Sequence, residues 1–404
     1  MSPSRFRLVC PACTRGAEPA ALGRCPCGAV LYPLYSDAAL RELTGIAPGP
    51  GIDRYRALLP VDTPIPFLGE GDTPLLRSAR LGRALGVEDL WFKVEARNPT
   101  GSFKDRAGAL AAALALQAGA RGVLTASSGN AAAAVATYSA AVGMGCLVLL
   151  EPGNPPDKVR QTVATGARLL PVAGLFSHGP QALSTMLRSV AARRGDYLAF
   201  VWAPINPSLV EAMKTISYEI AARLPGPPDL VVCPTGGGDL LAGQWRGWRE
   251  LHRTKVIDRL PRMIAVQSDR AAPLVAAFEA GAERVAALTS ARSGLSGINV
   301  AFSGEHALAA VRESAGAAVA VDEERVYELQ RRLAREEGVS VEPASASPLA
   351  ALDVLRTRGL LRSGQRVVCI LTGAGFKDAR LGADQALADG QAVPFEADAI
   401  VRSA

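Results

Sequence analysis

From about residue 88 onward, short apolar runs alternate with longer Ala/Leu-rich segments of helical period. Runs of this kind predict buried strands at Leu90–Val94, Gly122–Thr125, Cys146–Leu150, Arg168–Val172, Leu198–Trp202, Leu230–Cys233, Met263–Gln267 and Val367–Leu371. The segments between them predict helices at Phe103–Ala118, Pro207–Leu224, Glu323–Glu337 and Pro348–Arg358. Apolar strands separated by helices are typical of parallel sheets covered on both faces. The sequence therefore predicts an α/β fold, with ligands bound by the loops that follow the strands.

Length and charge exclude several other classes of protein. At about 100–200 residues per domain, 404 residues suggest two or three domains. The chain has 44 Lys and Arg against 38 Asp and Glu, a net charge of +6. The basic residues are scattered as pairs such as Arg193-Arg194, whereas a nucleic-acid-binding surface needs a clustered stripe. We therefore expect no nucleic-acid partner.

The segment Ser127–Leu150 carries no charge for 24 residues, a length that raises the question of a membrane span. Glycines at 129, 143 and 145 interrupt it, which favours a loop, a small-residue helix from Asn130 and a buried strand. No apolar stretch follows Met1–Ser4, so we also expect no secretory signal. These features predict a cytoplasmic protein with no membrane contact.

The seven cysteines fall into two groups. Three lie inside apolar runs and are expected in the core: Cys146, Cys233 and Cys369. The other four lie within 18 residues, as a C-x-x-C pair and a C-x-C pair. Two close pairs in a cytosolic type of sequence favour a structural zinc site in a small zinc-ribbon-like module, with the ligands Cys10, Cys13, Cys25 and Cys27. Free thiols or an emptied site are the alternatives, because a C-x-C pair is unusual in such modules.

Four small-residue loops that follow expected strands carry the candidate chemistry. In the string Asn98-Pro99-Thr100-Gly101-Ser102-Phe103-Lys104-Asp105-Arg106, Lys104 lies at the start of a helix among apolar neighbours. Burial and a helix N-terminus would lower the pKa of this amine, as imine formation requires. An exposed lysine paired with Asp105 is the alternative.

The other three loops offer anion cradles and a neutral hydroxyl. Ser127-Ser128-Gly129-Asn130 presents backbone N–H groups and hydroxyls to a carboxylate, although Ser128 or Asn130 could simply cap the helix. Thr235-Gly236-Gly237-Gly238-Asp239 lets the backbone wrap a phosphate, with a plain glycine-rich turn as the alternative. The fourth loop, Leu371–Asp378, is a strand end followed by small residues. Together the four loops suit pyridoxal phosphate acting on an amino acid.

In this order, the segments resemble the fold-type II (tryptophan synthase β-like) pyridoxal-phosphate enzymes, and among them the threonine synthases. The resemblance spans about residues 62–380, and the Asn98–Arg106 string is its most specific part. Further matching segments are Leu68–Leu75, Lys93–Glu95, Asn206-Pro207, Lys214-Thr215 and Glu342–Ala346. The resemblance implies a homodimer of chains with two parallel-sheet α/β domains and pyridoxal 5′-phosphate in the cleft between them. We place the larger, cofactor-binding domain at residues 36–110 and 205–390, the smaller at 111–204, the cysteine-rich module at 1–35 and a tail at 391–404.

The resemblance also implies a role for each matching residue. Lys104 would be the Schiff-base lysine and the general base that moves the α-proton. Asn130 would hydrogen-bond the phenolic oxygen of the cofactor, and Thr372 would face its pyridine nitrogen through a neutral hydroxyl. The rest of the cofactor site would be Phe103, Thr235, Gly236, Gly237, Gly238, Asp239 and Glu342. Ser127 and Ser128 would receive the carboxylate of a small amino-acid substrate, with further substrate contacts from Lys93, Lys158, Arg160 and Asn206.

Three departures from the threonine synthase pattern leave the substrate open. Ala374 and Phe376 stand where many of these enzymes carry His and Leu, and the phosphate loop reads Gly-Gly-Gly-Asp. The stretch Glu151–Lys158 has two prolines and an acid in the region where relatives receive the substrate phosphate. One candidate activity is threonine synthase, which converts O-phosphohomoserine and water to threonine and phosphate. The others are a serine/threonine ammonia-lyase and a β- or γ-replacement on a related activated amino acid. A non-catalytic binding protein is disfavoured by the intact Lys104.

Overall fold

The computed structural model describes residues 5–10, 13–17, 25–27, 29–45 and 49–377. Its strands form three sheets with the orders β12-β11-β10-β13-β5-β4, β8-β7-β6-β9 and β2-β1-β3. The predicted α/β class is confirmed: two mainly parallel sheets stand beside a small N-terminal module. The predicted tail at 391–404 lies outside the described residues.

The larger sheet is parallel throughout except for its edge strand β4, which pairs antiparallel with β5. Helices cover both of its faces, so its central strands are apolar along their whole length. The strands are β4 (Leu75–Arg77), β5 (Asp89–Val94), β10 (Leu230–Pro234), β11 (Arg262–Ser268), β12 (Ala317–Val321) and β13 (Arg366–Leu371). The helices are α2 (Leu81–Ala84), α7 (Pro207–Val210), α8 (Lys214–Arg223), α9 (Asp239–Arg253), α10 (Pro273–Glu279), α11 (Glu305–Glu313), α12 (Glu323–Glu337) and α13 (Pro343–Thr357).

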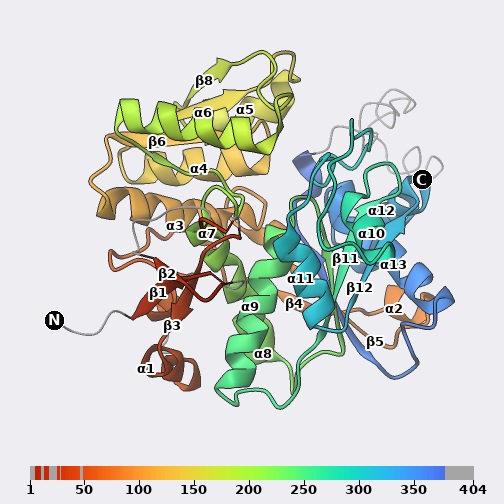
Figure 1. Ribbon diagram of the computed structural model, residues 1–404. Coiled ribbons are helices and arrows are strands. Elements are labelled where there is room, and N and C mark those ends of the chain that lie inside the picture. The colour runs from red at the N-terminus through yellow and green to blue at the C-terminus, as the bar shows by residue number, and fades with distance from the viewer. Residues whose placement is uncertain (1–4, 11–12, 18–24, 28, 46–48, 378–404) are drawn as a thin grey trace, which may run out of the picture.

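The smaller sheet is parallel in all its pairings. One face packs on α3 (Lys104–Gln117) and α4 (Asn130–Ala141), and the other on α6 (Gly179–Arg194). Its strands are β6 (Gly122–Ala126), β7 (Gly145–Leu150), β8 (Arg168–Pro171) and β9 (Asp196–Leu198), and α5 (Pro156–Ala164) follows β7. In Figure 1 this sheet and its helices lie above the larger sheet. Among the described residues, no helix combines the length and apolarity that a membrane span requires.

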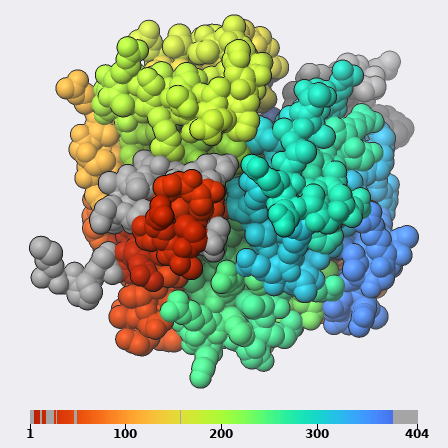
Figure 2. Space-filling view, viewed as in Figure 1, coloured from red at the N-terminus to blue at the C-terminus, as the bar shows by residue number. Residues whose placement is uncertain are grey.

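The N-terminal module contains β1 (Phe6–Val9), β2 (Gly16–Ala17) and β3 (Tyr32–Tyr35), followed by α1 (Asp37–Leu40) and the 3-10 turns η1 (Arg41–Thr44) and η2 (Asp53–Leu58). It docks on α8 and α9 through charged groups over aromatic rings. The Arg246 guanidinium lies 4.7 Å from the Tyr32 ring centroid, and Lys214 Nζ lies 3.8 Å from that of Tyr35. Figure 2 shows the module, in red, on the near face of the molecule.

The structure corrects several expected boundaries. The strand predicted at Leu198–Trp202 ends at Leu198, because the chain leaves this sheet edge and carries Trp202 toward the larger sheet. The last helix begins at Pro343, where a proline at the first helical position needs no N–H partner, and not at Pro348, which lies inside it. The helix predicted over 207–224 is divided by the 3-10 turn Glu211–Met213. Strand β12 was not predicted.

Candidate active site

Three of the four candidate loops leave neighbouring strands of the larger sheet. β10, β13 and β5 lie side by side and parallel, so their carboxyl ends share one sheet edge. The backbone N–H of Phe103 donates to Thr372 O at 3.0 Å, and that of Ala374 donates to Gly101 O at 2.9 Å. The lysine loop is therefore fastened directly to the loop after β13.

Lys104 opens α3 at this edge and is half-buried. Its Nζ lies 4.8 Å from the ring centroid of Phe103, and no described residue forms an ion pair or hydrogen bond with the ammonium. Burial lowers the pKa of Lys104, and the charge of the Asp239 carboxylate only partly opposes this. A lowered pKa leaves more of the amine neutral near pH 7, which is the nucleophilic form.

The smaller sheet contributes Asn130 to the same site. Asn130 opens α4 directly after the loop that follows β6. Its Nδ2 donates to Glu342 Oε2 at 2.9 Å, and its Oδ1 accepts from Lys377 Nζ at 2.7 Å. A carboxylate can only accept and an ammonium can only donate, so these partners fix the orientation of the amide. A Cβ at Gly373 would lie 1.9 Å from Glu342 Oε2, so only glycine allows this approach.

Thr372 provides the neutral hydroxyl that the resemblance calls for. Its Oγ1 lies 2.8 Å from Ser345 Oγ, and the Gly373 N–H donates to the same serine oxygen at 2.7 Å. The threonine hydroxyl therefore has an uncharged hydrogen-bond partner. An uncharged group of this kind would leave a facing pyridine nitrogen unprotonated.

The triple-glycine loop connects β10 to α9 and has the shape of a cradle. Gly238 adopts φ +99°, and a Cβ there would lie 2.4 Å from Ala307 Cβ, so glycine is required. The indole Nε1 of Trp202 is buried without a hydrogen-bond partner, 3.3 Å from the Cβ position of Gly237. A buried donor left unpaired is costly, and a phosphate oxygen in the cradle would satisfy it. The cradle therefore fits the phosphate of the cofactor that the fold implies.

Thr235 and Asp239, at the two ends of this loop, are held by protein partners. Thr235 Oγ1 donates to Cys233 O at 2.9 Å. Asp239 Oδ1 accepts from the Ala203 N–H at 2.7 Å and lies 3.2 Å from His306 Nε2. A hydrogen-bonded carboxylate beside an imidazole is less repulsive to a bound phosphate than an isolated one.

The expected carboxylate cradle lies beside Lys158 of α5. Ser127 Oγ accepts from the Gly129 N–H at 3.1 Å, and Ser128 lies between them in the turn. Lys158 and Arg160 are both exposed, and Lys158 Cε lies 4.0 Å from the Cβ position of Gly129. The exposed Lys158 side chain therefore lies next to this loop.

Lys93 and Asn206, the other two expected substrate contacts, are bonded to protein groups inside the fold. Both residues are fully buried. Lys93 Nζ donates to Glu219 Oε2 at 2.6 Å and to Thr73 O at 2.7 Å. Asn206 Nδ2 donates to Leu198 O at 2.8 Å, which ties the start of α7 to the edge strand β9. These hydrogen bonds join separate segments of the framework, while Asn206 Oδ1 is buried without a hydrogen-bond partner among the described residues.

Lys377 and Trp202 belong to the site but were not singled out in the sequence. Burial lowers the pKa of Lys377, opposed by the nearby Glu342 and Asp105 carboxylates. A lysine five residues after Thr372 in a ligand loop was a usable signal for Lys377. Trp202 has no such signal, because its apolar neighbours predict a strand.

A buried ionic network lies directly beneath the lysine loop. The Arg106 guanidinium binds Glu95 through Nε and Nη2, both at 2.8 Å, and Glu219 through Nη1 at 2.6 Å and Nη2 at 2.7 Å. Lys93 is the second cation and binds Glu219. Two buried cations thus face two buried carboxylates, and Arg106 is only two residues from Lys104.

Asp105 makes stability depend on pH. Burial raises its pKa to about 6, although the Thr100 N–H donates to it at 3.0 Å. The ordinary value is about 3.9, so the folded chain takes up this proton more readily than the unfolded chain. The contribution of Asp105 to stability therefore falls as the pH rises from about 4 to about 6.

We expect Asp105→Asn to remove this loss. The free energy of unfolding of the variant, minus that of the unaltered chain, should increase by roughly 2–3 kcal/mol between pH 4 and pH 7. Urea denaturation at each pH measures this difference. Asp258→Asn, at an exposed position, is the control and should show no such trend. A pH-independent difference for Asp105→Asn would contradict the assignment.

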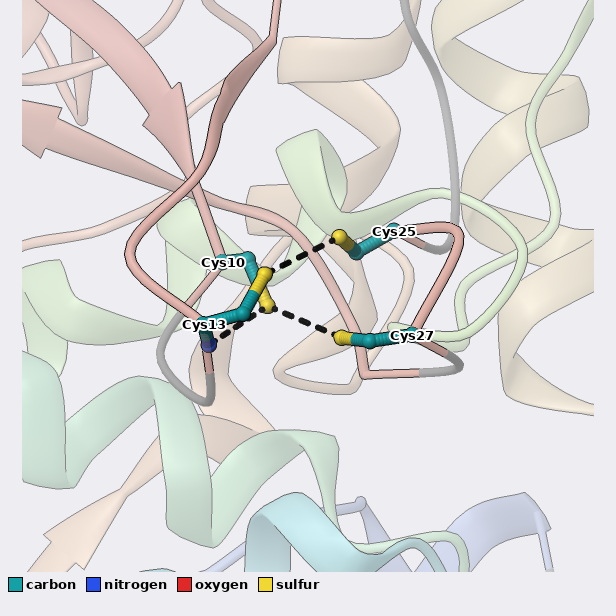
Figure 3. Close-up of side chains that lie close together, drawn as sticks. All are labelled: Cys10, Cys13, Cys25 and Cys27. Carbon is teal, nitrogen blue, oxygen red and sulfur yellow. Dashed lines mark hydrogen bonds between the residues drawn. The ribbon is translucent and has the colours of Figure 1, made fainter.

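The four cysteines of the N-terminal module converge (Figure 3). Their sulfur atoms all lie within 4.8 Å of one another, with Cys10 to Cys27 at 3.4 Å and Cys13 to Cys25 at 3.5 Å. Tetrahedral coordination with bonds of about 2.3 Å places sulfurs about 3.8 Å apart, so the cluster fits one metal ion. Because four thiolates complete a tetrahedron, the site leaves no position for catalysis.

Comparisons with known proteins agree with this geometry. Residues 66–373 match the family described as pyridoxal-phosphate dependent enzyme. A threonine synthase of Methanocaldococcus jannaschii is 36% identical over 364 residues, which are 88% of this chain and 88% of that protein. A threonine synthase of Mycobacterium leprae is 36% identical and covers 89% of this chain and 97% of its own.

Solved structures give the same architecture. A threonine deaminase of T.th. superposes with a TM-score of 0.63 at 29% identity, over 75% of this chain and 92% of its own. A maize serine racemase superposes with a TM-score of 0.65 at 22% identity, over 78% of this chain and 91% of its own. The second likeness concerns the fold alone.

Proposed function

The chain belongs to the pyridoxal-phosphate-dependent enzymes, and from this membership we propose that it is a threonine synthase, a lyase that converts O-phosphohomoserine and water to threonine and phosphate. The observation that carries the substrate is the position of Lys158. It places an exposed ammonium beside the loop proposed to receive the substrate carboxylate. A substrate with a second, phosphorylated end suits that arrangement, whereas serine and threonine have no such group.

The proposed roles follow the geometry of the site. When bound, pyridoxal phosphate supplies an electron sink for negative charge developing at the α-carbon of an amino acid. The backbone of Gly236–Gly238 and the indole N–H of Trp202 would hold its phosphate, and Asn130 and Thr372 would face its ring. Lys104 would attach it and then move the proton of the α-carbon. Ser127 and Ser128 would orient the substrate by its carboxylate, and Lys158 would hold the substrate phosphate.

Separate assays with O-phosphohomoserine, threonine and serine test the proposed reaction. We expect phosphate and threonine from the first substrate and neither ammonia nor a 2-oxo acid at a comparable rate from the others. Lys158→Gln should raise KM for O-phosphohomoserine about tenfold or more with a smaller change in kcat, because it removes a charge-assisted contact. Deamination of serine or threonine as the main reaction would instead identify an ammonia-lyase, in keeping with the name of the threonine deaminase whose structure is similar.

We also propose that the N-terminal cysteines bind one structural zinc ion. The proposal is supported by the geometry of the four sulfur atoms and by the burial of Cys10 and Cys25 beside Leu8 and Leu31. We expect one zinc per chain by metal analysis, none in Cys10→Ser/Cys13→Ser, and an unchanged value in the control Cys146→Ala. Because the module has little core of its own, metal removal should also expose it to protease before the rest of the chain. Four reactive thiols and no zinc in freshly purified protein would contradict the proposal.

A cytoplasmic homodimer is the remaining proposal. Bound thiolates suit a reducing compartment, and the family resemblance implies two chains per enzyme. Light scattering should give twice the chain mass of 42.0 kDa. A monomer that retains full activity would contradict the dimer.

A further inference from the structure

Four arginines gather at the edge of the smaller sheet that faces away from the candidate active site. All four strands are parallel, and the first residues of β6, β7, β8 and β9 line one pocket of about 420 Å³. The loop Ser127–Asn130, expected to receive the substrate carboxylate, follows the opposite end of β6. At about 3.3 Å per residue, the length of β6 puts the pocket roughly 15–20 Å from that loop. The pocket is thus a separate place on the molecule.

The arginines come from three parts of the chain. Arg121 precedes β6, Arg168 opens β8, and Arg193 and Arg194 end α6. The side chain of Arg121 lies over the end of α6, where its Cδ is 3.2 Å from the Cβ position of Gly195. The backbone N–H of Arg121 donates to Gly195 O at 2.8 Å, which fixes this part of the chain. Positive charges from three separate segments of the chain therefore line one pocket.

The charge of the pocket is mostly unbalanced. Asp196, with a side chain 3% exposed, is the one carboxylate among its lining residues, and its Oδ2 accepts from Arg194 Nε at 2.5 Å. No ion pair joins Arg121, Arg168 or Arg193 to a described carboxylate. A cation in the last turn of α6 is favourable toward the helix dipole, which accounts for Arg193 and Arg194 but not for Arg121 or Arg168.

The floor of the pocket allows a ligand to come close. A Cβ at Gly145 or Gly166 would meet no atom within 4 Å, so space is open above the backbone there. A volume of this size accommodates a small metabolite. Planar guanidinium groups bind phosphate through paired, charge-assisted hydrogen bonds. Three unbalanced arginines match a ligand with two to three negative charges.

We propose that this pocket is a second anion-binding site, which takes a small phosphorylated metabolite and is distinct from the cofactor and substrate sites. The proposal does not depend on the reaction assigned to the active site. The ligand class is defined by the chemistry of its phosphate, so pyrophosphate serves as the probe.

Calorimetric titration of the cofactor-loaded enzyme with pyrophosphate at constant ionic strength tests this site. We expect saturable binding, a loss of affinity of about tenfold or more in Arg121→Gln/Arg168→Gln, and no change in the absorbance of the bound cofactor. The matched control is Arg83→Gln/Arg331→Gln, which removes the same charge from exposed positions of the larger domain. It should bind pyrophosphate as the unaltered enzyme does.

Three outcomes would overturn the proposal. They are absence of saturable binding, equal weakening in both double variants, and displacement of the probe by substrate at the active site. Equal weakening would show that net charge alone attracts the probe. Circular dichroism and the cofactor absorbance of the double variants verify that both retain the fold.

Discussion

Replacing Lys104 with alanine should abolish turnover and the visible absorbance of the lysine-bound cofactor while leaving the chain folded. The loss in kcat should be roughly 10³-fold or more, because the proposed mechanism uses this one amine both as the attachment point and as the base. The fold should survive, since the ammonium of Lys104 forms no ion pair or hydrogen bond with a described residue and contacts only the ring of Phe103. Absorbance of the purified variant with added pyridoxal phosphate, together with steady-state rates, measures both effects.

A chemical trap makes the assignment specific to one lysine. Borohydride reduction of the loaded enzyme should leave the cofactor mass on the peptide that contains Lys104. The control Lys255→Asn alters an exposed lysine at φ +60°, a conformation that asparagine tolerates, and should keep both signals. Labelling of Lys377, or a Lys104→Ala variant that keeps the absorbance, would show that the wrong amine has been chosen.

Glu219→Gln should be the most destabilising single substitution that we predict, at about 3–5 kcal/mol in the free energy of unfolding. Burial alone would raise the pKa of Glu219, but the charges of Arg106 and Lys93 outweigh it and hold the pKa well below the ordinary range. Removing this carboxylate leaves two buried cations with only Glu95 between them. Urea denaturation at pH 7 measures the loss.

Two comparisons keep this prediction testable. Glu328→Gln breaks an exposed pair with Arg325 and should cost less than about 1 kcal/mol. Lys93→Met removes a cation but leaves Arg106 bonded to both carboxylates, so this variant should fold even if Glu219→Gln does not. A cost for Glu219→Gln no larger than that for Glu328→Gln would contradict the role of the network.

The apolar strands and the loops that follow them could be predicted from the sequence because each signal is local. A continuous run such as Leu230–Cys233 is nearly the whole of β10, and Lys104 opens the expected helix. The roles of Lys93 and Asn206 could not be predicted, because both depend on partners outside their own segments. Lys93 is neutralised by Glu219, 126 residues away. Lys377 had a local signal in its loop, but its partner Asn130, which opens α4 beside the smaller sheet, could not be predicted from that signal.

Trp202 shows a different limit of sequence reasoning. Its segment, Leu198–Trp202, is apolar enough to be a strand, yet β9 stops at Leu198. The chain turns there, and the main-chain N–H of Trp202 donates to Phe200 O at 2.9 Å. The indole then reaches the triple-glycine loop. The apolar run correctly predicts that Trp202 is buried. It does not predict which part of the molecule the indole packs against.

The docking of the N-terminal module also sets an order of events during synthesis. Pro33 leaves the ribosome early, whereas Arg246, which donates to its carbonyl oxygen, is made 213 residues later. At roughly 5–20 residues per second, the module waits about ten to forty seconds before its docking surface exists. Ribosome-bound chains stopped before α9 should therefore be cut by protease between module and body, and chains stopped well after it should not. For that interval, a zinc ion bound as proposed would be the main source of order available to the first-made part of the enzyme.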